Sequence, residues 1–199
     1  MKRRSLNRPL AYITKVGILA ALAAILMLLE IPFLFVAPDF YKFDFSELPV
    51  LVGSFALGPI AGLLIELIKN LLNIFLEGTV TIGIGEFANF LTGCSFVLPA
   101  AIVYRLKKSR SAALWGMLIG TLTLTVVGSL LNYFVLIPMY SAVHPIEEII
   151  EMGAKINPAI GNLPLFVVLA VAPFNLIKGA IISVLTFVLY KRVSPLLKL

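Results

Sequence analysis

The feature that most constrains the fold is a series of apolar runs that recurs along the chain. The longest cover residues 11–36, 112–140 and 163–190. A helix needs about 20 predominantly apolar residues to cross the hydrocarbon core of a bilayer. The composition agrees, with 60% hydrophobic and 13% charged residues, where soluble domains have about half and about a quarter. These runs predict a polytopic α-helical membrane protein.

We predict an all-α membrane protein with six transmembrane helices in one domain, residues 1–199. The expected spans are residues 11–36, 48–57, 59–76, 82–104, 112–140 and 163–190. The second is too short to cross as a helix, because Gly58 and Pro59 interrupt it. It must be tilted, buried in protein or extended into its neighbours. The more polar residues 141–162 are compatible with a short interfacial helix.

Basic residues concentrate on one side of this topology. With the N-terminus inside, the inner segments hold Lys2, Arg3, Arg4, Arg8, Lys15, Arg105, Lys107, Lys108, Arg110, Lys191, Arg192 and Lys198. The outer segments hold only Lys42 and Lys155, together with most of the acids. The excess of basic residues in cytoplasmic loops predicts a cell-membrane protein with both termini cytoplasmic. The net charge of +6 therefore reflects topology, and we expect no nucleic-acid partner.

Two polar residues in the last span are the strongest candidates for a site. Asn175 and Lys178 lie three residues apart and share one face of a helix. A charge near the centre of a bilayer costs at least about 2.5–3.5 kcal/mol, so such residues usually serve a function. The alternative is a structural lysine that pairs with a carboxylate from another helix.

Further polar residues in spans four and five could converge with them. Glu86, Asn89 and Asn132 lie in the outer half or middle of their predicted helices. We expect a pocket open to the outside, with Glu86 alternatively serving as the partner of Lys178. An aromatic loop would form its lid and contains Phe40, Tyr41, Phe43 and Phe45. Such a pocket suits an aromatic molecule with several hydroxyl groups.

The third span carries a second polar face, for which we favour a structural role. Glu66, Lys69, Asn70 and Asn73 share one side of the helix. Glu66 and Lys69 can neutralise each other, and paired charges need no ligand.

The first span carries two pairs of small residues at a spacing of four. Ala20 and Ala24 form one pair, and Gly17 and Ala21 form the other. Small residues at this spacing let helices approach closely, either within the chain or at a partner.

Sequence signatures of catalysis are absent. The sequence has no Walker A motif and no nucleophile with an adjacent base. Cys94 and His144 are each the only residue of their type, which argues against a disulfide or a metal centre. Gly83-x-Gly85-x-x-Ala88 matches a dinucleotide fingerprint only formally, because no βαβ unit surrounds it. We therefore predict no enzyme, metal or cofactor; an intramembrane lipid-modifying enzyme that uses Glu86 or Glu66 as a base is the weaker alternative.

Several motifs resemble the substrate-binding S components of energy-coupling factor (ECF) vitamin transporters. The shared motifs are Asp44-Phe-Ser-Glu-Leu-Pro49, Gly53-Ser-Phe-Ala-Leu-Gly-Pro-Ile-Ala-Gly62 and Lys69-Asn70. Gly85-Glu-Phe-Ala-Asn-Phe90 and Ala172-Pro-Phe-Asn-Leu-Ile-Lys-Gly179 narrow the resemblance to riboflavin-specific S components. Thiamine, biotin or folate remain alternative ligands.

The resemblance implies a six-helix protein that binds riboflavin as a transported ligand, not as a cofactor. It also implies a transmembrane coupling protein and two cytosolic ATPases as partners. On this basis Ala20 and Ala24 dock the coupling protein, and Asn175 and Lys178 contact the ribityl hydroxyls or the ring edge. Glu86, Asn89 and Asn132 complete the pocket, and the loop from Phe45 to Leu48 covers the ring.

Overall fold

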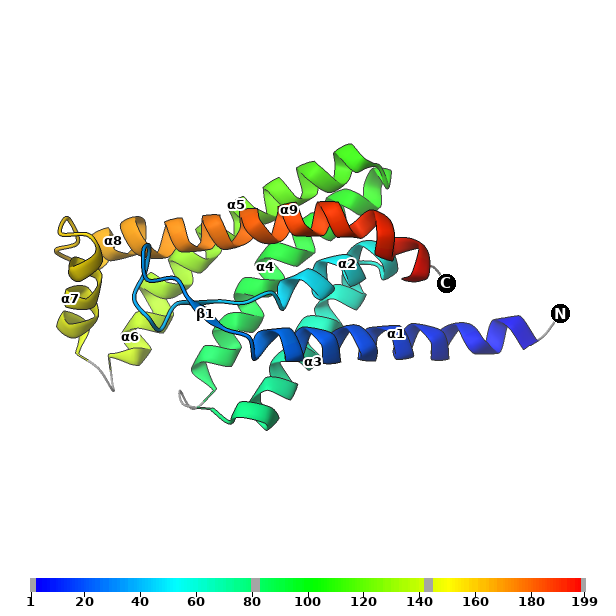
Figure 1. The fold of residues 1–199 in the computed structure, drawn as a ribbon, viewed down its shortest axis with the longest axis horizontal. Coiled ribbons are helices and arrows are strands. Elements are labelled where there is room, and N and C mark those ends of the chain that lie inside the picture. Colours follow the sequence, from blue (N-terminus) through cyan, green and yellow to red (C-terminus); the bar gives the residue numbers. More distant parts are fainter. Residues whose placement is uncertain (1–2, 80–82, 142–144, 198–199) are drawn as a thin grey trace.

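The protein is a bundle of long helices that run roughly along one axis (Figure 1). The computed structural model describes residues 3–79, 83–141 and 145–197; His144 lies outside these ranges. Five helical stretches are long and apolar enough to cross a membrane, namely Pro9–Met27, Pro59–Glu77, Ile84–Lys107, Arg110–Tyr140 and Leu163–Tyr190. A shorter apolar helix, Glu47–Leu57, accompanies them. The prediction of a mostly helical, polytopic protein is therefore confirmed.

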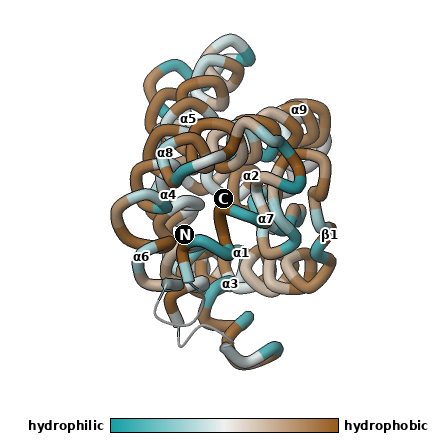
Figure 2. The backbone as a smooth tube through the Cα atoms, turned by 90° about the vertical axis from the view of Figure 1, so that its left-hand side faces the viewer, coloured by the Kyte–Doolittle hydropathy of each residue, from teal (hydrophilic) through white to brown (hydrophobic). Residues whose placement is uncertain are grey.

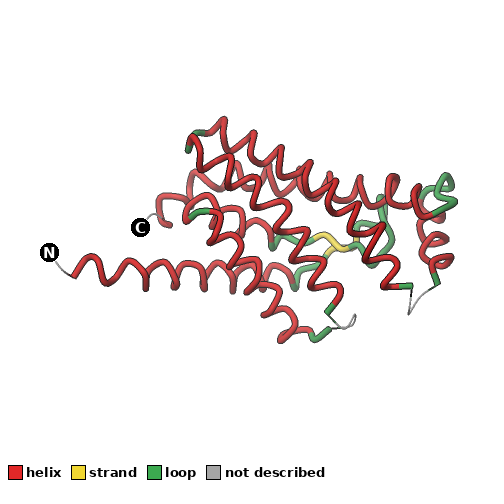
Figure 3. Tube along the Cα trace, turned by 180° about the vertical axis from the view of Figure 1, so that it is seen from behind, coloured by secondary structure: helices red, strands yellow, loops and turns green. Residues whose placement is uncertain are grey.

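The first helix ends earlier than the sequence predicted. Helix α1 covers Arg3–Met27, whereas we expected a span as far as residue 36. Beyond it the chain is extended, and strand β1 (Ile31–Pro32) pairs antiparallel with strand β2 (Lys42–Phe43). Pro32 disfavours a helical backbone at Ile31, the residue before it. Glu30, just before the strand, accepts a hydrogen bond of 2.5 Å from Lys42 Nζ. This bond raises the pKa of Lys42 and fastens the hairpin, which is yellow in Figure 3.

Gly58 separates the next two helices, as predicted. Helix α2 covers Glu47–Leu57 and α3 covers Pro59–Glu77. Gly58 has φ = 107°, a conformation that residues with a Cβ rarely adopt. The two helices then pack closely, because a Cβ atom on Gly62 would lie 2.7 Å from Cβ of Ser54.

Two of the long helical stretches contain a π-helical turn. Helix α5 (Arg110–Leu131) continues through a π turn at Asn132–Leu136 into α6 (Ile137–Tyr140). Helix α8 (Leu163–Phe166) continues through a π turn at Val167–Val171 into α9 (Ala172–Leu197). Each π turn ends two residues before a proline, Pro138 or Pro173. Proline removes a hydrogen bond and crowds the preceding turn, so a locally wider turn is a reasonable response.

The remaining helices complete the bundle and define its two ends. Helix α4 (Ile84–Lys107) packs against α5, where a Cβ atom on Gly120 would lie 2.4 Å from the carbonyl oxygen of Phe96. The start of α1 and the end of α9 lie at one end, and α7 (Ile146–Ile156) lies at the other (Figure 1). Residues 141–162 thus contain the short helix considered above. Hydrophobic residues dominate along the long helices (Figure 2), and outward-facing Trp115 and Phe134 are 60% and 67% exposed, as expected for lipid-facing positions.

Candidate functional site

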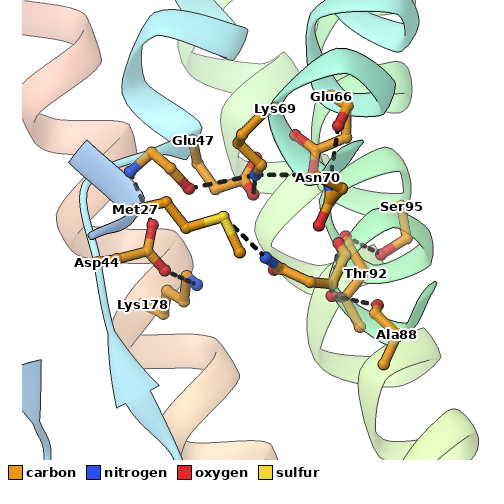
Figure 4. Close-up of polar contacts among 12 residues, drawn as sticks. Met27, Asp44, Glu47, Glu66, Lys69, Asn70, Ala88, Thr92, Ser95 and Lys178 are labelled. Carbon is orange, nitrogen blue, oxygen red and sulfur yellow. Dashed lines mark hydrogen bonds and ion pairs between the residues drawn. The ribbon is translucent and has the colours of Figure 1, made fainter. Parts of the chain in front are cut away.

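Lys178 forms an ion pair with a loop residue. Its Nζ atom lies 2.9 Å from Oδ2 of Asp44, and the two side chains are only 12% and 7% exposed. Asp44 lies between β2 and α2, and its Oδ1 atom accepts a hydrogen bond from the backbone N–H of Ser46. Figure 4 shows Lys178 reaching from α9 to the extended chain that carries Asp44. The carboxylate beside Lys178 therefore comes from this loop.

Asn175 and Asn132 come from two different helical stretches, and each lies next to Gly128. Asn175 donates to the carbonyl of Val171 (3.1 Å), and Asn132 donates to the carbonyl of Gly128 (2.8 Å). A Cβ atom on Gly128 would lie 2.8 Å from Nδ2 of Asn175, so a larger residue here would displace the Asn175 amide. Both amides are buried, at 6% and 7% exposure. Asn132 begins one π turn, and Asn175 donates to Val171, the last residue of the other; π turns are often found at functional sites.

The aromatic loop covers these amides. The hydroxyl of Tyr41 donates to Oδ1 of Asn132 at 2.5 Å. The Tyr41 ring lies 5.4 Å from the ring of Phe174 and 6.3 Å from that of Phe166, measured between centroids. The loop thus joins the hairpin to α8, α9 and the π turn of Asn132, and its polar groups bond to the candidate ligand-binding residues.

The neighbouring part of the loop is also aromatic and half-buried. Phe45 packs edge-on against Phe43, with ring centroids 5.0 Å apart. Leu48, in the first turn of α2, donates its backbone N–H to the carbonyl of Phe45 at 3.1 Å. Phe45 therefore follows Asp44 directly in the chain, and Leu48 lies in the helical turn that comes next.

The two candidates on α4 have contacts elsewhere. Asn89 donates to the sulfur of Met27 on α1 (3.6 Å), and Glu86 accepts from the hydroxyl of Thr79 (3.2 Å) at the turn between α3 and α4. The aromatic loop contacts Asn132 and Lys178. Asn89 instead contacts α1, and Glu86 contacts the segment between α3 and α4.

A buried ionic cluster lies beside this site, at the junction of α2 and α3. Lys69 Nζ lies 2.8 Å from Oε1 of Glu47 and 2.7 Å from Oε1 of Glu66. These three side chains are at most 3% exposed, and Asn70 donates a further hydrogen bond to Glu66. Figure 4 shows Lys69 between the two carboxylates. The predicted pairing of Glu66 with Lys69 is confirmed, and Glu47 is an additional partner.

The two alanines expected to dock the coupling protein lie inside the bundle in this structure, and their role in docking stays a prediction. Ala20 and Ala24 are 0% and 1% exposed; they face the interior, where neighbouring Leu19 would lie 2.9 Å from a Cβ atom on Gly53 of α2. These alanines therefore pack α1 within the chain. The second small pair, Gly17 and Ala21, faces outwards, and a Cβ atom on Gly17 would meet nothing within 4 Å.

Sequence reasoning missed Asp44 and Glu47 as charge partners. Both lie in the motif Asp44-Phe-Ser-Glu47, which precedes the second predicted span. A count of charges does not reveal them, because Glu66 and Glu86 are already available to neutralise Lys69 and Lys178. The only signal in the sequence is that a buried lysine requires a nearby carboxylate and that this motif supplies two.

Comparisons with known proteins agree on one family. Residues 11–190 match the family model described as the substrate-specific component of ECF transporters. The chain is 38% identical to the riboflavin transporter RibU of Staphylococcus aureus (strain TCH60), covering 92% of this chain and 90% of that protein. It is 33% identical to the riboflavin transporter FmnP of Bacillus subtilis (strain 168), covering 90% of each. A solved structure, described as the S component of a bacterial ECF transporter, has a TM-score of 0.73 at 36% identity and covers 94% of this chain and 98% of that one.

Proposed function

The chain belongs to the family of substrate-specific components of ECF transporters, and we propose that it is a membrane subunit that binds riboflavin for uptake. The observation that carries this proposal is the similarity to riboflavin transporters over at least 90% of the chain. In this reading the subunit performs no chemical reaction, and riboflavin is a transported ligand and not a cofactor.

The site described above offers suitable chemistry for this ligand. Riboflavin combines a flat aromatic ring system with a chain of hydroxyl groups. Asn132, Asn175 and Lys178 can bond hydroxyls or ring heteroatoms, and rings of the Tyr41 loop can pack on the flat face. We propose Glu86 and Asn89 as more peripheral contacts, because their hydrogen bonds point to other elements. Phe45 and Leu48 would cover the ring.

The loop contacts suggest how the ligand enters. Tyr41 bonds to Asn132, and Asp44 bonds to Lys178, so the loop satisfies the same polar groups that a ligand would use. A ligand hydroxyl can replace the Tyr41 hydroxyl on Asn132 without leaving a buried polar group unpaired. We infer that the loop lifts to admit riboflavin and closes again over its ring.

We further propose six membrane crossings, with both termini in the cytoplasm and residues 1–199 acting as one domain. Five stretches can cross alone, and α2 with the extended chain before it would provide the sixth. The shared end of α1 and α9 supports an even number of crossings (Figure 1). The partners would be an ECF module, made of a transmembrane coupling protein and two ATPases, whose ATP state shifts the subunit between conformations.

The direct test is an absorbance spectrum of the detergent-purified protein, followed by titration of flavin fluorescence after the ligand has been removed. We expect a flavin spectrum and saturable quenching at about one ligand per chain. Asn175→Ala should weaken binding about 5- to 150-fold, the equivalent of about 1–3 kcal/mol for an unpaired buried group. Lys178→Ala should also weaken it.

Asn73→Ala is the matched control, since Asn73 is an equally buried amide (6% exposed) on α3. It should leave the affinity for riboflavin within about twofold of the parent protein. A colourless protein that leaves riboflavin fluorescence unchanged would reject the ligand and direct attention to thiamine, biotin and folate. Normal binding by both Asn175→Ala and Lys178→Ala would reject the site.

A further inference from the structure

A cavity of about 340 Å³ lies near the end of the bundle where α1 begins. Its walls come from four helices, including Tyr12 of α1, Ala56 of α2, Pro59 of α3 and Ala101 of α4. Arg105 and Lys108, at the end of α4, complete the lining. None of the residues described above for riboflavin lines this cavity, so it is a separate candidate site.

The charges around the cavity favour an anion. No Asp or Glu lines it, and in the part of the chain that the structure describes, the side chains of Arg105 and Lys108 have no hydrogen bond or ion pair. The first turn of α3, which also lines the cavity, contains no acid and has no side-chain cap. Pro59 has no N–H and Gly62 donates to Gly58, so the N–H groups of Ile60 and Ala61 add the partial positive charge of the helix start next to the two cationic side chains.

The surroundings of the cavity are apolar. Ile60, which lines it, is 66% exposed, and Ile102 and Leu106 on α4 beside Arg105 are 52% and 79% exposed. Exposed aliphatic side chains of membrane helices face acyl chains, so an anion here can carry lipid tails. Basic pockets between transmembrane helices on the cytoplasmic side typically receive the head groups of anionic lipids.

We propose that this cavity binds a phosphate group, with the phosphodiester of an anionic phospholipid as its natural source. Arg105 and Lys108 hold the phosphate oxygens, and the acyl chains lie along Ile60, Ile102 and Leu106. Under the proposed topology the lipid belongs to the cytoplasmic leaflet. The site is independent of riboflavin binding, so either assignment can fail without the other.

The test is native mass spectrometry of delipidated protein titrated with phosphatidylglycerol, and separately with phosphatidylcholine. Glycerol 3-phosphate serves as a soluble competitor that carries the phosphate without acyl chains.

Lys108→Gly is a useful variant because Lys108 has φ = 44°, which glycine adopts without strain. Loss of this charge should therefore not impair folding. Arg105→Gln removes the second charge, and Ala56→Phe fills the cavity without changing charge. Lys107→Gln is the matched control, since Lys107 lies on the same turn but does not line the cavity.

We expect phosphatidylglycerol to bind more tightly than phosphatidylcholine. Lys108→Gly and Arg105→Gln should each reduce its binding about fivefold, Ala56→Phe should reduce it as well, and Lys107→Gln should change it less than twofold. Competition by glycerol 3-phosphate at concentrations similar to those of the lipid would support the phosphate site but assign it to a free phosphate compound. Equal losses in all three charge variants, or equal binding of both lipids, would overturn the proposal. Thermal unfolding of each variant confirms that it is folded.

Discussion

Lys178 is a residue with two separable roles. It neutralises Asp44 at 2.9 Å in a nearly buried position, and under the proposed function it also contacts riboflavin. Substitution of Lys178 alone affects both roles at once, because it also leaves Asp44 without its partner. A charge left alone in such a place destabilises the fold whether or not it touches a ligand.

Asp44→Asn and the double variant Asp44→Asn/Lys178→Met separate these roles. Asp44→Asn leaves Lys178 unpaired, and we expect a loss of about 3 kcal/mol in the free energy of unfolding. The double variant removes both charges and should recover most of that stability, because neutral replacement of a buried pair is often tolerated. The measurements are the thermal unfolding midpoint in detergent and the dissociation constant for riboflavin. If the double variant regains full affinity together with its stability, Lys178 has no direct contact with the ligand.

At the scale of single elements, the long helices and the break at Gly58 could be predicted from the sequence. Apolar length determines where a helix can cross a membrane, and Gly58 followed by Pro59 is a strong signal for a break. The hairpin of β1 and β2 could not be predicted, because Ile31 to Val36 is apolar enough to continue a span. Its strands pair residues 10 and 12 positions apart, Pro32 with Lys42 and Ile31 with Phe43, and an apolar run does not report such pairing.

The candidate site could likewise be predicted from the sequence only in part. Asn175 and Lys178 stand out because polar residues in an apolar run require an explanation. Tyr41, the partner of Asn132, and Asp44, the partner of Lys178, each lie more than 90 positions from the residue that they contact, and no local sequence pattern reports such contacts. The burial of Ala20 and Ala24 was equally beyond the sequence, because a face of small residues packs equally well inside the chain or against a partner.

The ionic cluster between α2 and α3 permits a prediction about these elements. Glu47, Glu66 and Lys69 contain two carboxylates and one ammonium, and Oε2 of each glutamate has no hydrogen-bond partner among the residues that the structure describes. Lys69→Met leaves two buried carboxylates without a cation, so we expect a loss of about 3–5 kcal/mol in the free energy of unfolding. Glu66→Gln keeps the 2.8 Å pair of Lys69 with Glu47 and removes the excess acid, and it should change stability by only about 1 kcal/mol. Thermal unfolding in detergent compares the two, and equal damage by both would show that Glu66 and not the charge balance holds α2 against α3.

At the scale of the whole molecule, the two small-residue faces of α1 differ in burial. Ala20 and Ala24 face inwards, whereas Gly17 and Ala21 face outwards with open space at Gly17. A coupling protein that docks closely on α1 in this conformation would meet Gly17 and Ala21. Small residues at a spacing of four let a partner helix approach the backbone, so a larger side chain on this face should keep it away.

Gly17→Leu and Ala21→Leu test whether this face is the docking surface. Each side chain points outwards, so the isolated subunit should fold and bind riboflavin with a dissociation constant within about twofold of the parent protein. Riboflavin uptake into proteoliposomes that contain the subunit and the ECF module should fall at least about tenfold, because the added bulk prevents close approach of the partner helix. Thr123→Leu on α5 is the matched control, since it places the same side chain at a partly exposed position of another helix. Normal uptake by both α1 variants, or an equal loss of uptake in Thr123→Leu, would contradict this docking surface. The coupling protein would then dock elsewhere, or α1 would first have to rotate to expose Ala20 and Ala24.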